Sequence, residues 1–431
     1  MEEYISETLY PLYFRNKQAA QLGQEIKNRH SVILVGMKRV GISNFLRFFI
    51  YQQKIQETFI HDQKKHLFIA VDLNDMVERE IFPFWILTFK RIVDAVEAST
   101  IPQETKKEIQ DLFLNSIQIN DQFMMIENIR KTLSKIIELG LLPTIFLIRF
   151  DRMQQVATEN FFANLKGLQD SMSPHLSFVI TCFRPLEDLI PKLKKTFLSS
   201  FTHPIFLKPA SEADQKVLLD TYQVRYGLNL NPNQKKQLFD LVGGHIRFLQ
   251  LAMIILNENH KLTFEKVLKK INQDERIMLQ AEELWESLTQ EEQQILKKMI
   301  DSSISANEIE KHRYLIETGF VINKNNQYQI FTSFLDSYIK NHTISQNNSD
   351  NSIEFTKKEL ALFTFLQKNL NQVCERDQII EAVWTDEEEA LEVSDWAMDR
   401  LVARVRAKLK KQKSDSEILT IRTRGYKLIS N

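Results

Sequence analysis

The chain has 431 residues, of which 43% are hydrophobic, and its 56 Lys and Arg balance 56 Asp and Glu. So many apolar side chains can form several cores, which excludes a disordered chain and suggests three or four domains. Because the net charge is zero, any affinity for nucleic acid must be local. The two cysteines, Cys182 and Cys374, lie far apart, and the most apolar run, Ile81 to Phe89, is too short to span a bilayer. We therefore expect a cytoplasmic protein without disulfides and without a membrane partner.

A glycine-bounded loop near the N-terminus has the layout of a phosphate-binding loop. An apolar run at residues 31–36 ends in Gly36, and a helical stretch follows the second glycine, Gly41, with four residues between the two glycines. Strand, loop and helix in this order are typical of a P-loop, whose backbone N–H groups and helix N-terminus bind phosphate. The lysine expected after the second glycine is Ile42, whereas Ser43 stands where the hydroxyl that binds Mg²⁺ belongs.

Apolar segments in the first half of the chain predict a parallel sheet. Besides residues 31–36, strands are expected at residues 67–73, 144–150, 177–182 and 203–208. Residues 75–142, between the second and third strands, have mostly helical periodicity. Alternating strands and helices favour a parallel sheet with helices on both faces.

These segments resemble the AAA-like core of STAND-type and archaeal origin-recognition-type ATPases. The resemblance covers about residues 1–342, and its motifs lie at residues 13–16, 36–43, 147–153 and 241–250. It implies an AAA-like core with a helical lid, and ATP or ADP as the bound nucleotide. The histidine of the lid motif would approach the nucleotide phosphates. The implied nucleotide-binding residues are Gly36, Gly41, Ile42, Ser43 and His245.

The chain differs from this family at the positions that carry out ATP hydrolysis. Besides the lysine replaced by Ile42, the acidic pair that holds Mg²⁺ and orients water is replaced by Ile148-Arg149. A second alignment makes Asp151 the Mg²⁺ ligand, but the glutamate beside it is still missing. Both alignments predict little or no ATP hydrolysis and no catalytic residue, with weak nucleotide binding at most.

Residues 281–342 have the pattern of a small winged helix. Thr289 and Glu292 form a capping-box pattern at a helix start, and a turn at residues 325–326 predicts a hairpin wing. The segment is similar to the domain that follows the lid in STAND proteins. Its predicted wing carries only one cation, Lys324, which favours a packing or interaction role over DNA binding. Upstream, Arg184 is interpreted either as a finger that reaches a second subunit or as a local bridge.

The most basic stretch of the chain lies at its C-terminus. From Trp396 to the end, ten Lys and Arg oppose three Asp and Glu, a local net charge of +7. Arg400, Arg404 and Lys408 recur at helical spacing two residues after an apolar series. Two residues are about 200° of helix, so the basic stripe should lie opposite the apolar face and bind phosphates. The apolar series is Met398, Val402, Val405 and Leu409.

The same region resembles the effector domain of OmpR/PhoB-type response regulators, through blocks at residues 355–363, 376–384, 404–409 and 421–428. The resemblance implies a winged helix that binds double-stranded DNA. The basic stripe would enter the major groove, and Leu401 would make an apolar contact with a base. Arg406 and the wing would meet phosphates or the minor groove. The expected DNA-binding residues are Arg400, Arg404, Arg406, Lys408, Arg422, Thr423 and Arg424.

An acidic run at residues 386–395 precedes this helix. It is interpreted either as a solvated loop or, as the resemblance implies, as a contact for RNA polymerase. No pair of histidines has HxxxH or HxH spacing, so no metal site is expected.

We therefore expect a multidomain α/β protein with winged helices. Its order is an AAA-like parallel-sheet core (1–208), a helical lid (209–275), a winged helix (281–342), a linker (343–352) and an OmpR/PhoB-like winged helix (353–431). The favoured function is a sequence-specific transcription regulator whose first module senses a signal or forms a homo-oligomer. The alternatives are a nucleotide-dependent switch ATPase anchored on DNA and an interaction scaffold of a defence or mobile-element system.

Overall fold

The computed structural model divides the chain into two compact units, residues 1–339 and 340–431, each with its own hydrophobic core. At residues 343–348, 395–397, 410–411 and 430 only the course of the backbone is described. The described residues are 6–61, 65–76, 78–191, 203–301, 303–324, 326–348, 355–384, 395–412, 414, 416–421 and 425–430.

Five parallel strands form the central sheet of the first unit, in the order β2-β3-β4-β1-β5. All five predicted strands are present, and β1 and β4 are buried along their whole length, as apolar runs in a sheet covered on both faces require. Several strand ends differ from the predicted ones by one to three residues. The third strand, for example, ends at Ile148, because Arg149 adopts a left-handed backbone (φ 59°). The strands are β1 (Val32–Val35), β2 (Lys65–Asp72), β3 (Leu141–Ile148), β4 (Ser177–Cys182) and β5 (His203–Phe206).

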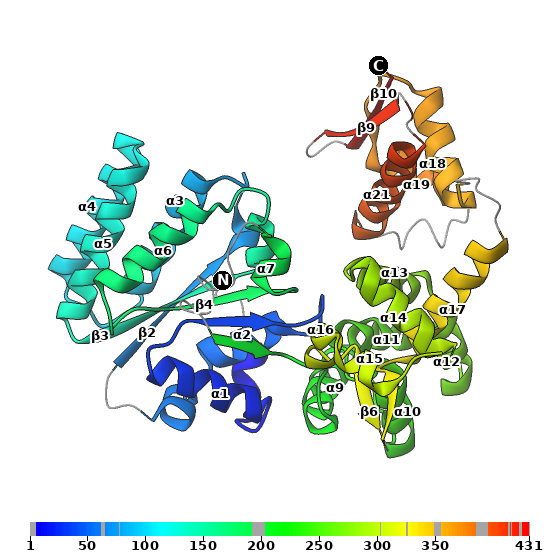
Figure 1. Cartoon of the computed structure of the whole chain (residues 1–431), viewed down its shortest axis with the longest axis horizontal. Helices are drawn as coiled ribbons and strands as arrows, with labels where there is room; N and C mark the ends of the chain where they lie inside the picture. The colour runs from blue at the N-terminus through cyan, green and yellow to red at the C-terminus, as the bar shows by residue number, and fades with distance from the viewer. Residues whose placement is uncertain are drawn as a thin grey trace. The chain divides into compact units, whose positions relative to one another are not determined.

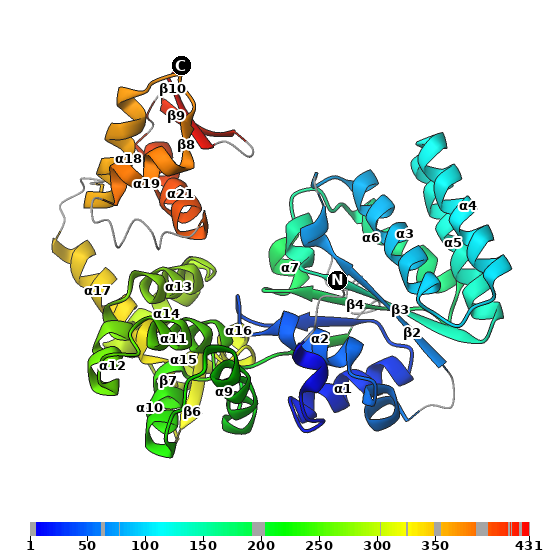
Figure 2. The same cartoon turned by 180° about the vertical axis from the view of Figure 1, so that it is seen from behind.

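Helices cover both faces of this sheet (Figures 1 and 2). The steps from β2 to β3 and from β3 to β4 run in one direction across the sheet, and their crossover helices α3 to α6 lie on one face. The step from β1 to β2 runs in the opposite direction, and its helix α2 lies on the other face with α1. Because parallel crossovers are right-handed, the direction of each step decides the face. The helices are α1 (Asn16–Lys27), α2 (Ile42–Tyr51), α3 (Ile81–Glu97), α4 (Gln103–Ile119), α5 (Gln122–Glu138) and α6 (Glu159–Ser171).

A helical lid follows β5. Capping boxes begin α9 and α10, and Gly244 lies in the turn between α10 and α11 with φ 80°. A Cβ on Gly244 would lie 2.3 Å from the carbonyl oxygen of Ala210, so only glycine lets this turn approach the segment after β5. The lid helices are α9 (Glu212–Tyr226), α10 (Pro232–Val242), α11 (Ile246–Glu258), α12 (Phe264–Gln273) and α13 (Glu275–Glu286).

Four helices and a hairpin complete the first unit and share its apolar core. The predicted capping box of Thr289 and Glu292 is present at the start of the first helix, and the predicted hairpin is formed by two antiparallel strands. The last helix continues to Asn348, so residues 343–348, which were expected to belong to a linker, are helical. The elements are α14 (Gln290–Ile300), α15 (Ala306–Glu310), α16 (Arg313–Glu317), β6 (Val321–Lys324), β7 (Gln327–Ile330) and α17 (Ser333–Asn348).

Among the described residues between 355 and 430, the second unit has three helices beside a three-stranded antiparallel sheet of order β8-β10-β9. The predicted basic helix is α21. Its predicted apolar face is buried, with the four side chains of the series at most 3% exposed. The elements are α18 (Lys357–Lys368), β8 (Cys374–Glu375), α19 (Arg376–Val383), α21 (Asp395–Lys411), β9 (Ser416–Ile421) and β10 (Gly425–Ser430).

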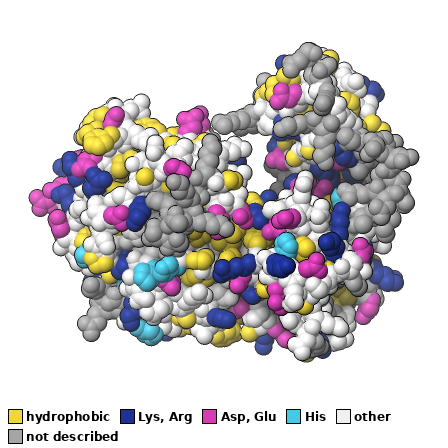
Figure 3. All heavy atoms as spheres, in the orientation of Figure 1, with side chains coloured by type: hydrophobic (Ala, Val, Ile, Leu, Met, Phe, Trp, Pro, Cys, Tyr) yellow, Lys and Arg dark blue, Asp and Glu magenta, His cyan; other side chains and the backbone are white. Residues whose placement is uncertain are grey.

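Basic and acidic side chains are interspersed over the visible face of the first unit, in agreement with the zero net charge (Figure 3). Among the described residues, no helix combines the length and the apolar character that crossing a membrane requires.

Candidate nucleotide cavity and DNA-binding helix

The loop between β1 and α2 has the geometry of an anion cradle. Its first glycine, Gly36, donates its N–H to the carbonyl of Cys182 (3.3 Å), which holds the loop against β4. Its second glycine, Gly41, precedes α2 with φ 108°, and a Cβ there would lie 2.1 Å from Cδ1 of Ile246 in the lid. No side chain caps the start of α2, so its first N–H groups point into the space beyond the loop.

A cavity of about 960 Å³ lies beyond this loop. Its walls come from the carboxyl ends of β3 and β4, the N-terminal segment, and the lid helices α9 and α11. This volume is within the range of small-molecule sites. The expected residues Gly36, Gly41, Ile42 and Ser43 line it. Sequence reasoning missed the other side of the cavity, because its residues come from elements far apart in the chain. These missed residues include Glu7, Tyr10, Arg47, Tyr222, Arg225, Arg247 and Gln250.

The described lining residues carry more positive than negative charge, which suits an anionic ligand. Two of the cations are paired across the cavity wall, Arg39 with Glu283 (2.8 Å) and Arg47 with Glu7 (2.5 Å). The ammonium of Lys38 lies 4.7 Å from the ring centre of Phe183 rather than along the loop. The six lining cations are Lys38, Arg39, Arg47, Arg149, Arg225 and Arg247, and the three lining carboxylates are Glu7, Asp151 and Glu283.

The end of β3 lacks the carboxylates that would hold Mg²⁺. Ile148 is its last residue, and the next, Arg149, donates its N–H to the hydroxyl of Thr181 (2.9 Å) and forms an ion pair with Asp72. Asp151, two residues on, lines the cavity. Burial raises the pKa of its carboxyl, and the nearby Lys38 and Arg149 offset this only in part. Burial thus makes the ionised form of Asp151, the form that binds Mg²⁺, more costly.

His245 does not line the cavity, although the resemblance implied that it approaches the phosphates. It is fully buried, its Nε2 lies 2.9 Å from the carbonyl oxygen of Lys38, and its Nδ1 accepts from the N–H of Phe248 (3.4 Å). An acceptor at Nδ1 requires the proton on Nε2, so the ring donates to the phosphate-binding loop. Burial lowers its pKa to about 4. The neutral ring therefore fastens the lid to the loop.

Arg184 is a local bridge. It is 7% exposed, and its guanidinium binds the carboxylate of Glu292 (2.8 and 3.0 Å) and Asp188 (2.9 Å) and stacks on Tyr314. A buried and fully engaged guanidinium cannot reach a second subunit. The contact fastens the end of β4 to the start of α14 instead.

The basic stripe of α21 is only partly presented to solvent. Glu359 of α18 has a side chain only 2% exposed, and it pairs with Arg404 (3.5 Å) and Lys408. Each four-residue step advances about 40° around the helix, so the stripe drifts by about 80° between Arg400 and Lys408. The expectation that the whole stripe lies opposite the core is therefore wrong at its C-terminal end.

The outermost face of α21 is formed by different residues. Among the positions whose side chains are described, Asp399, Ala403 and Ala407 are exposed, and they recur every four residues. Arg400 and Arg404 lie at intermediate exposure along one edge of this ridge. Leu401, expected to touch a base, is 1% exposed and belongs to the core.

Arg406 is engaged in holding the wing sheet. Its Nε donates to the carbonyl of Ile418 (2.7 Å), its Nη2 donates to the hydroxyl of Thr420 (2.8 Å), and its guanidinium lies 5.9 Å from the ring centre of Tyr426. These contacts join α21 to β9. The predicted wing contacts Arg422, Thr423 and Arg424 and residues 386–394 of the acidic run lie outside the described residues.

Two family models match the chain. One lies within the second unit, and the other lies in the first unit except for its last two residues. Residues 350–428 match the model described as transcriptional regulatory protein, C terminal. Residues 203–341 match the model of an AAA-like domain. The chain thus carries an AAA-like module followed by a winged helix of the OmpR/PhoB type, as the sequence motifs predicted. No curated protein matches the chain.

A solved structure shows the same fold for the first module. A Walker-type ATPase of Pyrococcus abyssi aligns with a TM-score of 0.52 and 14% identity over 78% of this chain and 97% of its own. The ORC2 protein of Aeropyrum pernix, in its ADPNP and ADP complexes, aligns with a TM-score of 0.47 and 13% identity over 81% of this chain and 98% of its own. At such identities the likeness concerns the fold alone.

Proposed function

We propose that the chain is a sequence-specific, DNA-binding transcription regulator, and that its AAA-like module senses a ligand or assembles the protein without hydrolysing ATP. The observation that carries the first part is α21, which lies on a winged helix of the regulatory type. Its exposed ridge begins with Asp399 and continues with two small residues, Ala403 and Ala407, and cations lie along one edge. Ala403 and Ala407 let the helix approach bases closely, and Arg400 and Arg404 stand beside them.

The contacts divide into two groups under this proposal. Arg400 and Arg404 read base edges in the major groove, and the wing residues Arg422, Thr423 and Arg424 meet phosphates or the adjacent minor groove. Arg406 and Lys408 support the site, Arg406 through its hydrogen bonds to β9 and Lys408 through its ion pair with Glu359, and both contribute positive potential. The same proposal includes two further roles. The acidic run at 386–395 contacts RNA polymerase, and the first module forms a homo-oligomer.

A binding selection from random DNA duplexes tests the regulatory function. The full chain should enrich one defined site. Arg400→Ala should relax the preference at one position of that site, at a cost of about 1–3 kcal/mol. The matched control Lys368→Ala removes an exposed cation from α18 and should leave the preference unchanged. Binding without any enriched sequence would rule out a sequence-specific regulator.

The proposed loss of hydrolysis rests on the composition of the cavity. Backbone N–H groups, Ser43 and an excess of cations can hold a nucleotide, but Ile42 supplies no ammonium and Arg149 stands where a Mg²⁺ ligand would be. Nucleotide binding without turnover would make the cavity a sensor. The cytoplasmic location belongs to this proposal and agrees with two buried, unpaired cysteines.

Two measurements on the full chain test this part. Calorimetry with ADP should detect binding, and phosphate release with ATP and Mg²⁺ should stay at the buffer rate. Magnesium-dependent release that Ser43→Ala abolishes would contradict the proposal and favour the rival function, a switch ATPase anchored on DNA.

A further inference from the structure

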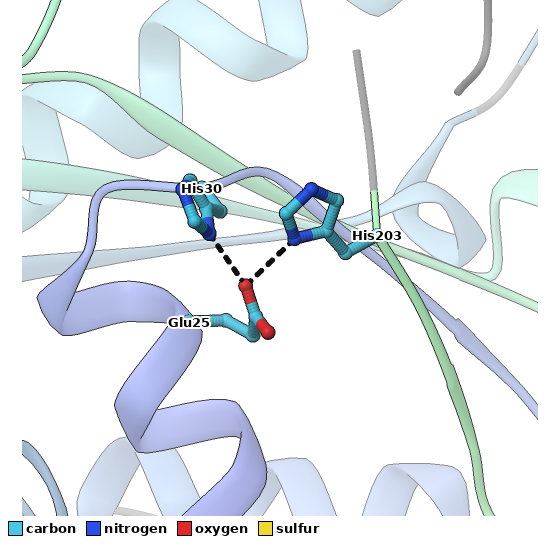
Figure 4. A group of neighbouring side chains, drawn as sticks. All are labelled: Glu25, His30 and His203. Carbon is cyan, nitrogen blue, oxygen red and sulfur yellow. Dashed lines mark hydrogen bonds and ion pairs between the residues drawn. The ribbon is translucent and has the colours of Figure 1, made fainter. Parts of the chain in front are cut away.

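Three potential metal ligands meet at an edge of the central sheet, away from the nucleotide cavity. One oxygen of the Glu25 carboxylate, Oε2, lies 2.8 Å from Nδ1 of His30 and 2.9 Å from Nδ1 of His203. Figure 4 shows the two imidazole rings next to each other, each with a nitrogen turned toward this oxygen. The two ring centres are 4.4 Å apart, and the three ligand atoms all lie within 4.8 Å of one another.

The fold brings these residues together through backbone contacts. His30 closes the end of α1 by donating its N–H to the carbonyl of Glu25 (3.0 Å). His203, the first residue of the edge strand β5, donates its N–H to the carbonyl of Ser31 (2.8 Å) and stands opposite Val32 in register. Histidines at 30 and 203 therefore lie side by side whenever β1 and β5 pair.

Hydrogen bonds from Arg29 hold the turn that carries His30. Arg29 adopts a left-handed backbone (φ 60°), and its guanidinium donates to the carbonyls of Pro143 (2.6 Å) and His175 (2.5 Å). Such anchoring lowers the entropy that a ligand must remove when it binds, so the site is largely preorganised.

We propose that Glu25, His30 and His203 bind a divalent transition-metal ion, with zinc as the ion that fits best. Two imidazole nitrogens and one carboxylate oxygen form a donor set that zinc accepts and that Mg²⁺ and Ca²⁺, which prefer oxygen, do not. Ligands of tetrahedral zinc at about 2.1 Å from the metal are about 3.4 Å apart. Opening each of the present hydrogen bonds by about half an ångström reaches this spacing, and water would complete the shell.

Metal binding would displace the proton from each histidine Nδ1, because a ring nitrogen that donates to Glu25 must lose that proton before it can be a ligand. Burial raises the pKa of the Glu25 carboxyl, but hydrogen bonds from His203 and His30 outweigh it and lower the pKa overall. The carboxylate is therefore ionised near neutral pH. The histidine side chains are 45% and 49% exposed, so an ion reaches them directly from solvent. Histidine side chains are visible on the surface of the first unit in Figure 3.

A bound ion would join the turn between α1 and β1 to the first residue of β5. Because β5 leads directly into the segment that carries the lid, the ion would stabilise the edge of the sheet from which the lid extends. Metal binding would then raise the thermal stability of the first unit through mass action.

The test is a titration of the full-length, metal-free chain, without a histidine tag, with zinc chloride in a calorimeter. We expect one zinc ion per chain, binding at least about tenfold weaker in Glu25→Gln and in His203→Gln than in the wild type, and no heat with Mg²⁺. The matched control His260→Gln removes an exposed histidine outside the cluster and should bind like the wild type.

Two further measurements keep the result decisive if a variant folds poorly. Cobalt added to the unmodified chain should give ligand-field absorption without a thiolate charge-transfer band, which separates this site from the two cysteines. Zinc should raise the melting temperature of the wild type and of His260→Gln. No stoichiometric zinc binding by the wild type, or undiminished binding in a folded His203→Gln, would overturn the proposal and leave a hydrogen-bonded cluster only.

Discussion

Replacing Glu359 by Gln should make the second unit less stable and yet increase its affinity for DNA. Glu359 is buried at the start of α18, where its carboxylate accepts from the N–H of Thr356 (2.7 Å) and pairs with Arg404 and Lys408. Glutamine can still accept the capping bond. The variant therefore loses the two ion pairs but keeps the cap.

The magnitude follows from the exposure of the two cations. Exposed ion pairs contribute at most about 1 kcal/mol, and removing one partner of a fully buried pair costs about 3–5 kcal/mol. Arg404 and Lys408 have side chains 22% and 26% exposed, so solvent screens the interaction in part. We expect a loss of about 1–3 kcal/mol in the local free energy of unfolding. Because the helix loses its acidic neighbour, the slope of log affinity against log salt should steepen by about one to two.

Hydrogen exchange of peptides from α18 and α21 in the full chain measures the stability, and fluorescence anisotropy over a salt series measures DNA binding. The matched control is Glu381→Gln, which removes an exposed carboxylate from α19 in the same unit. Glu381→Gln should change both the hydrogen exchange and the salt slope less than Glu359→Gln does. If Glu359→Gln leaves exchange unchanged, or weakens DNA binding in parallel with stability, the assigned role of Glu359 is refuted.

Three other predictions concern the two units separately. Ile42→Lys should not create magnesium-dependent ATP turnover, because Arg149 still occupies the end of β3, and phosphate release checks this. Residues 353–431 should fold alone and bind duplex DNA at low salt, since this unit has its own core; circular dichroism and anisotropy of the fragment decide. Lowering the pH from about 6.5 to about 4 should reduce the stability of the first unit. Burial lowers the pKa of His245 to about 4 in the folded state, so the unfolded chain takes up the proton first. The full effect is on the order of 3 kcal/mol, and a folded His245→Asn variant should lose this part of the pH dependence in thermal unfolding.

Local patterns were sufficient to predict much of the fold. Unbroken apolar runs gave the five strands, and the pair Thr289 and Glu292 gave a helix start, because these signals depend only on residues close in sequence. The apolar series of α21 predicted its buried face for the same reason. The glycine-bounded loop likewise predicted the cradle in front of α2.

Contacts between distant segments could not be predicted in this way. The pairing of Glu359 with Lys408 depends on how α18 crosses α21, and the burial of Leu401 depends on the width of the apolar arc that this crossing covers. The family resemblance placed His245 beside the nucleotide phosphates. In the fold, however, its ring contacts the backbone of the phosphate-binding loop at Lys38. The cluster around Glu25 was missed because its members are 5 and 178 residues apart, and spacing rules detect only neighbours along a helix or loop.

A change of one charge on the exposed ridge of α21 tests the central claim most directly. Ala403→Glu places a carboxylate where the helix would face the bases, and the matched control Gln367→Glu makes the same change of charge on the exposed face of α18. Anisotropy with the site enriched by the full chain should show at least about a hundredfold loss for Ala403→Glu, since a repelled and desolvated charge costs several kcal/mol. Gln367→Glu should lose only a few-fold. Equal affinities of the two variants, with both folded, would show that α21 is not the helix that reads DNA.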